Sequence, residues 1–197
     1  MAESLTISAS ADRVTIYEEL VPQIEALIRG ETDLTANLAN VAAALKESFG
    51  FFWVGFYMAR DGQLVLGPFQ GPIACTRINF DQGVCGHAFS TRKTTIVPDV
   101  DQFPGHIACS SAARSEIVVP IFDLHGEAVG VLDVDSDRLD DFGQEDADGL
   151  NAVVRLIEAS LAEPAVEFGR PHEAKTDPRV GKNLESSAIS ELVSGER

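Results

Sequence analysis

Basic residues are scarce in this sequence. Its 197 residues include 15 Lys and Arg against 31 Asp and Glu, which gives a formal net charge of −16. A chain with this excess of negative charge and no basic stripe is repelled by phosphate backbones and by anionic membrane surfaces. The composition therefore argues against nucleic-acid binding and against peripheral membrane binding.

Long apolar runs, a secretory signal and paired cysteines are also missing. No run approaches the roughly 18–20 residues that span a bilayer, and the polar start MAESLTISASADR has no apolar signal core. The chain has three cysteines, an odd number that argues against a structural disulfide framework. We expect a cytoplasmic protein whose thiols are reduced.

The remaining composition is that of a globular protein, with 45% hydrophobic and 23% charged residues. Apolar residues at helical spacing predict three helices. The first ends at Gly30 and contains Pro22, which implies a kink or a later start, and the second is capped by Thr32 or Asp33. The helices are expected near residues 14–28, 34–49 and 144–162.

Strand-like patterns fill the middle of the chain. A hairpin turn at Asp61-Gly62 joins the first two strands, and a second pair meets around His125-Gly126. The strands are expected at residues 51–58, 63–69, 94–97, 116–122 and 128–135. Together these elements predict a single α+β domain over residues 13–162, made of helices, an antiparallel sheet and a closing helix. Residues 1–12 are expected to be flexible, and residues 163–197 to form a disordered tail.

Two metal sites can be considered and rejected from spacing. A calcium loop counted from Asp133 would need Gly and Glu where the chain has Arg138 and Gln144. Zinc sites usually have closely paired ligands, and no C-x2-C pair occurs. The candidate zinc ligands would be Cys75, Cys85, Cys109, His87, His106 and His125. We predict no metal and no cofactor.

The three cysteines allow two interpretations, as buried apolar residues or as a catalytic dithiol. Free cysteines are often small buried apolar residues. Here each lies among turn-forming residues, which would let two cysteines approach and part as a catalytic dithiol requires. Gly83 can begin a short helix whose N-terminus would favour a thiolate at Cys85.

Strand alternation gathers polar residues on one face of the sheet. Residues i and i+2 of a strand share a face, so Trp53 and Tyr57 lie together, as do Asp133 and Asp135. Glu116 is out of phase with its apolar neighbours. If these strands are neighbours, the shared face is a polar pocket with an aromatic wall. Such a pocket suits a small cationic or zwitterionic ligand.

The stretch from Gly30 to about Leu150 resembles the free methionine-(R)-sulfoxide reductases, which are built on a GAF-type domain. The resemblance is carried by GETDLTANLANVAAAL, WVGFY, LVLGPFQG, GVCGHA, VPDV, FPGHIACSS, SEIVVPI and GVLDVDS. It implies a GAF-like fold, a central antiparallel sheet flanked by helices, with a ligand pocket on one face. It also implies reduction of the R epimer of free methionine sulfoxide, recycling by thioredoxin and a role against oxidative stress. A homodimer is expected from the resemblance alone.

The family motif carries cysteines that match Cys75, Cys85 and Cys109. We assign Cys109 as the nucleophile that becomes a sulfenic acid, and a second cysteine then forms a disulfide with it. Cys75 and Cys85 both remain candidates for that resolving role, and the reverse assignment, in which Cys85 attacks, also stays open.

The remaining pocket residues have assignable roles. Glu116 or Asp133 would protonate the sulfoxide oxygen, since clustered carboxyls raise one another's pKa. Trp53 and Tyr57 would hold the methyl group, and Asp135 completes the acidic pocket that suits an ammonium. The alternative function is a GAF sensor module that binds a small ligand, or responds to redox state, without turnover.

Overall fold

The computed structural model describes residues 4–105 and 112–161. Within them the helices are α1 (Arg13–Ile28), α2 (Leu34–Phe49), α3 (Gly83–Thr91), the 3-10 turn η1 (Val100–Gln102) and α4 (Gln144–Leu161). The strands are β1 (Trp53–Arg60), β2 (Gln63–Gln70), β3 (Arg77–Asn79), β4 (Thr95–Val97), β5 (Ser115–Phe122) and β6 (Ala128–Ser136). No helix in these residues is long and apolar enough to cross a membrane.

The strands of this described part form one six-stranded antiparallel sheet in the order β3-β2-β1-β6-β5-β4. The expected hairpin turn between β1 and β2 is confirmed. Asp61 and Gly62 both have positive φ, 50° and 79°, the combination that a two-residue turn between twisted strands requires. Because β1 pairs with β6, the two hairpins lie side by side in one sheet, as the strand-alternation argument required.

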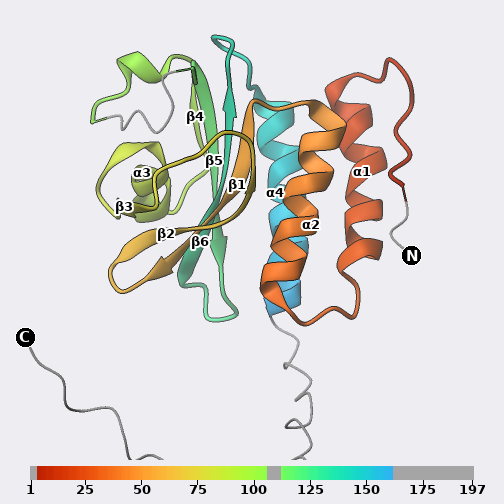
Figure 1. Cartoon of the computed structure of the whole chain (residues 1–197), viewed down its shortest axis with the longest axis horizontal. Coiled ribbons are helices and arrows are strands. Elements are labelled where there is room, and N and C mark those ends of the chain that lie inside the picture. The colour runs from red at the N-terminus through yellow and green to blue at the C-terminus, as the bar shows by residue number, and fades with distance from the viewer. Residues whose placement is uncertain (1–3, 106–111, 162–197) are drawn as a thin grey trace, which may run out of the picture. The chain divides into compact units, whose positions relative to one another are not determined.

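The two faces of the sheet are covered differently (Figure 1). Helices α1, α2 and α4 cover one face, while α3 packs on the other against β5 and β6. Alternate residues of the strands divide between the two faces as predicted. Val54, Phe56 and Val134 enter the core beneath the three long helices, and Trp53 and Tyr57 belong to the smaller cluster beneath α3.

The helix boundaries agree with the predicted signals. The Asp12 carboxylate accepts a hydrogen bond from the Thr15 amide and begins α1 at Arg13, so the helix does not start at Pro22, which lies inside it. Of the two predicted caps for α2, Asp33 is the one that bonds, to the Ala36 amide. Gly50 ends this helix in the left-handed conformation, with φ of 67°.

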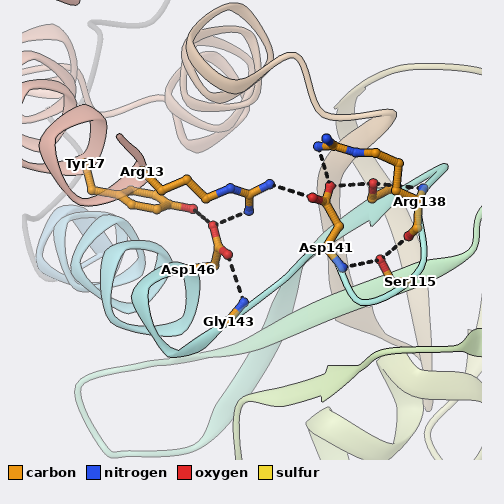
Figure 2. Close-up of polar contacts among 8 residues, drawn as sticks. Arg13, Tyr17, Ser115, Arg138, Asp141, Gly143 and Asp146 are labelled. Carbon is orange, nitrogen blue, oxygen red and sulfur yellow. Dashed lines mark hydrogen bonds and ion pairs between the residues drawn. The ribbon is translucent and has the colours of Figure 1, made fainter. Parts of the chain in front are cut away.

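A charged network fixes the start of α1 to the start of α4 (Figure 2). Arg13 binds Asp146 and Asp141 at 2.7 and 2.9 Å. Asp146 is fully buried, and it also accepts hydrogen bonds from the Tyr17 hydroxyl and the Gly143 amide. Burial and the neighbouring Asp146 raise the pKa of Tyr17, so its hydroxyl stays a donor.

The structure adds elements that the sequence patterns did not indicate. Strand β3 and turn η1 have three residues each, which is too short for a recognisable period. Residues 4–12 contain no helix or strand, although the Thr6 and Ser8 amides donate to Gln23 and Glu19 of α1. The predicted tail, residues 163–197, lies outside the described residues.

Candidate active site

Three sheet residues named from the sequence form a row across neighbouring strands. Asp135 of β6 lies opposite Trp53 of β1 on one side and opposite Glu116 of β5 on the other. Asp133 is two residues before Asp135 on β6, so it faces the same side of the sheet. The sequence prediction that these side chains share one face is therefore confirmed in position.

Cys85 approaches this face from α3. Its sulfur lies 3.9 Å from Oε1 of Glu116. The three side chains of Cys85, Glu116 and Asp133 are buried. The Cys85 sulfur and one carboxyl oxygen from each of the two acids lie within 4.8 Å of one another. The sheet and α3 thus bring a thiol and two carboxyl groups together beneath the helix.

Burial makes this cluster reluctant to ionise. Desolvation, followed by repulsion from Asp133 and Asp135, raises the pKa of Glu116 well above its ordinary value. The pKa of Asp133 rises to about 6, mainly through burial, although hydrogen bonds from Cys85 and Glu116 oppose the rise. The pKa of Asp135 is raised by burial and by Asp133. The three carboxyls therefore hold their protons to a higher pH than ordinary carboxyls do, as was expected of clustered carboxyls, and burial is the larger cause.

The prediction that the helix N-terminus favours a thiolate at Cys85 is wrong, because the pKa of this thiol is raised. Helix α3 does begin at Gly83, so Cys85 lies in its first turn. Burial, then the charges of Asp133 and Glu116, raise the pKa of the Cys85 thiol well above its ordinary value, and they outweigh the helix terminus. Cys85 is also 4% exposed inside a regular helix, not in a flexible turn.

An aromatic wall stands beside the cluster. Trp53 and Tyr57 stack with ring centroids 6.0 Å apart, and Phe69 of β2 stacks on Trp53 at 5.4 Å. Phe69 was not singled out from the sequence. A Cβ at Gly55 would lie 2.3 Å from that of Phe69 and 2.6 Å from the Trp53 ring, so this glycine allows the two rings to stack. A glycine inside a strand is the sequence signal for such a close approach.

The other two cysteines stand differently. Cys75 lies in the loop between β2 and β3, where it is partly buried and disulfide-bonded. Among the described cysteines, Cys85 is a free thiol. Cys109 and His106 lie outside the described residues.

Neither of the metal sites considered from the sequence is assembled in the described part of the chain. Asp141 of the acidic loop binds Arg13 and Arg138, and His87 lies edge-on to the ring of Phe103. Within those residues, the group that could hold a metal is instead Cys85, Glu116 and Asp133. Oδ1 of Asp133 is a buried acceptor with no hydrogen-bond partner in the described residues.

A hollow of about 550 Å³ lies elsewhere, between α1 and α4. Its lining includes Val14, Tyr17, Glu145 and Ala152, and it lacks the cysteines and the carboxyl groups of the cluster. The thiol and the carboxyl groups lie on the opposite face of the sheet, so we take that face as the candidate site.

Known proteins resemble this chain along the whole domain. The GAF domain family matches residues 31–162. GAF domain-containing protein A of Dictyostelium discoideum is 56% identical over 159 residues, 80% of this chain and 99% of that protein. The free methionine-R-sulfoxide reductase of Escherichia coli is 43% identical over 152 residues, 77% of this chain and 92% of that protein.

A solved structure of a free methionine-R-sulfoxide reductase is also similar to this chain. The X-ray structure of free methionine-R-sulfoxide reductase from Neisseria meningitidis, in complex with its substrate, superimposes with a TM-score of 0.78. It is 52% identical and covers 80% of this chain and 95% of that one. The sheet, its helices and the matched residues define a GAF-domain protein. Within that class, the chain belongs to the family of free methionine-R-sulfoxide reductases.

Proposed function

We propose that this protein reduces free L-methionine (R)-S-oxide to L-methionine. The observation that carries the proposal is a pair of buried carboxyls, Glu116 and Asp133, on the same face of the sheet as an aromatic wall. A sulfoxide sulfur is a poor electrophile until its oxygen is protonated, so the site must offer an acid as well as a thiol. Carboxyls whose pKa values are raised keep a proton to higher pH than ordinary carboxyls do, so they are suited to provide that acid.

The substrate groups match the side chains of the pocket. The rings of Trp53 and Tyr57 suit the methyl group on sulfur, and their close packing would exclude the bulk of a peptide chain. The acidic edge at Asp135 suits the ammonium of a free amino acid. We propose Glu116 as the proton donor, because burial and the charges of Asp133 and Asp135 all raise its pKa. Asp133, whose hydrogen bonds oppose the effect of burial, would be its partner.

For the thiol chemistry we propose Cys109 as the nucleophile. Its sulfur takes the sulfoxide oxygen, so that cysteine is oxidised to a sulfenic acid while methionine sulfoxide is reduced to methionine. The thiol of a second cysteine then attacks the sulfenic sulfur, forming a disulfide and releasing water. Two observations favour Cys75 for this resolving step: Cys75 takes part in a disulfide, and Cys85 is a buried thiol with a raised pKa.

An external dithiol must reopen the disulfide, and we propose thioredoxin for this role in a reducing cytoplasm. Exchange needs an accessible disulfide, and Cys75 lies in a loop next to exposed residues such as Ile73, which is 89% exposed. We also expect a homodimer, on family grounds.

Single-turnover assays of cysteine variants test the proposal. Methionine release from the free R-sulfoxide would be measured without reductant, and then with dithiothreitol or thioredoxin. Cys109→Ser should release none, because the nucleophile is gone. Cys75→Ser should release one equivalent and then stop.

Cys85→Ser is the matched control, since it removes the third thiol from the same pocket. It should keep the first turnover and the recycling. Loss of the first turnover in Cys85→Ser, with release retained in Cys109→Ser, would show that Cys85 attacks. A wild-type protein that binds the sulfoxide without releasing methionine would instead be a sensor module.

A further inference from the structure

The loop that carries Cys75 is fastened to the aromatic wall of the pocket. This loop, residues 71–76, joins β2 to β3. The Tyr57 hydroxyl donates a hydrogen bond to the backbone carbonyl of Cys75 at 3.0 Å. The Trp53 indole nitrogen, Nε1, donates one to the carbonyl of Pro72 at 3.1 Å. Both aromatic side chains therefore hold the loop with their polar ends.

A third contact brings the start of the loop against Trp53. Gly71 has a φ of +142°, and a Cβ there would lie 2.6 Å from Cδ1 of the Trp53 ring and 3.1 Å from the Phe52 carbonyl oxygen. Only glycine allows the loop to pass the ring this closely. The loop is thus held at both ends of its path across the wall, at Gly71 and Pro72 and again at Cys75.

These contacts persist over the working pH range. Burial, and then the neighbouring Asp133, raise the pKa of Tyr57, so its hydroxyl remains a donor. An indole nitrogen donates and does not titrate. Trp53 and Tyr57 are 3% and 1% exposed, so water has little access to either donor group.

We propose that Trp53 and Tyr57 are positioning residues for Cys75: their hydrogen bonds to the loop 71–76 hold the resolving cysteine beside the pocket and speed disulfide closure. This inference rests on the proposed function. The step concerned joins a cysteine sulfenic acid and the Cys75 thiol into a disulfide with release of water, and it needs no other oxidant. The rings that face the substrate methyl group and the donors that hold the loop belong to the same two side chains, so pocket packing and closure are coupled.

The test compares two rate constants in one experiment. A single turnover is started with the free R-sulfoxide and quenched at intervals. Methionine release and disulfide closure are followed separately, the sulfenic acid being trapped with dimedone. Tyr57→Phe keeps the ring and loses the donor, so closure relative to release should fall about five-fold, the effect of one hydrogen bond. Trp53→Phe should lower the same ratio of closure to release. It replaces Tyr57→Phe as the test if that variant does not fold.

Phe69→Leu is the matched control. Phe69 stacks on Trp53 in the same wall, and its side chain has no group that could donate to the loop. This variant should change methionine release and leave the rate constant of closure unaltered. An equal fall in closure for Phe69→Leu would overturn the proposal, because wall packing alone would then control the step. An unchanged ratio in Tyr57→Phe and Trp53→Phe would overturn it as well.

A second measurement needs no turnover. In protein reduced with dithiothreitol and then freed of it, Cys75 should be alkylated by iodoacetamide about five-fold faster in Tyr57→Phe than in wild type, as mapped by mass spectrometry. An unchanged alkylation rate would contradict the proposal that the Tyr57 hydrogen bond holds the loop 71–76. If the wild type releases no methionine while this difference is found, the proposed function fails and the positioning of Cys75 stands.

Discussion

Replacing Asp133 by Asn should change how the stability of this protein depends on pH. The Asp133 carboxyl lies between Glu116 and Cys85 and is 6% exposed. Its pKa rises from the ordinary 3.8 to about 6 in the folded protein. The folded state therefore holds a proton that the unfolded chain releases as the pH passes 4.

The sign follows from this difference in bound protons. Well below pH 4 both states are protonated, and Asp133 causes no change. Between about pH 4 and 6 the unfolded chain binds fewer protons than the folded protein, so the free energy of unfolding falls as the pH rises. A rise from 3.8 to about 6 corresponds to about 3 kcal/mol, because one pKa unit is about 1.4 kcal/mol.

The assay is urea unfolding of the reduced protein at pH 4, 5, 6 and 7, for wild type and Asp133→Asn. The stability of the variant relative to wild type should increase by about 2 kcal/mol from pH 4 to pH 7, the part of the full difference that falls in this range. Loss of Asp133 also relieves the repulsion that raises the pKa of Glu116, which acts in the same direction. Asp137→Asn is the control, since Asp137 is exposed just beyond β6, and its difference from wild type should stay flat. A flat difference for Asp133→Asn would refute the raised pKa of Asp133 in the folded protein.

Three further predictions concern the fold and the site. Asp146→Asn should lower the free energy of unfolding by about 3 kcal/mol, because it leaves Arg13 without its buried partner, whereas Arg29→Ala in an exposed ion pair should change it by less than about 1 kcal/mol. Gly149→Ala should lower it by about 1–3 kcal/mol, since the new Cβ would lie 2.2 Å from the Tyr17 ring; urea unfolding measures all three variants. Treatment with a chelator should leave methionine release unchanged, because thiols and carboxyls supply the proposed chemistry.

Much of the site geometry follows from strand alternation. A strand has a period of two, so Asp133 and Asp135 must face the side that Leu132 and Val134 do not. The hairpin signal at Asp61-Gly62 fixed the pairing of the first two strands. The pairing of β1 with β6, which joins the two hairpins, has no local signal, and alternation alone could only assume it.

The errors concern effects that depend on the environment of a residue. A helix N-terminus near Cys85 was visible in the sequence, but the burial of this side chain between α3 and the sheet was not. Burial decided the direction in which the pKa of Cys85 shifts. The acceptors for Trp53 and Tyr57 are backbone carbonyls. Any residue can provide a carbonyl, so no sequence pattern predicts where such a tether forms.

The most direct test of the central proposal is the fate of racemic free methionine sulfoxide incubated with the protein and dithiothreitol, followed by chiral chromatography. We predict that the R epimer is converted fully to methionine while the S epimer remains. Peptide-bound methionine sulfoxide in a parallel reaction should also remain. Persistence of the R epimer, or equal loss of both epimers, would contradict the proposed function.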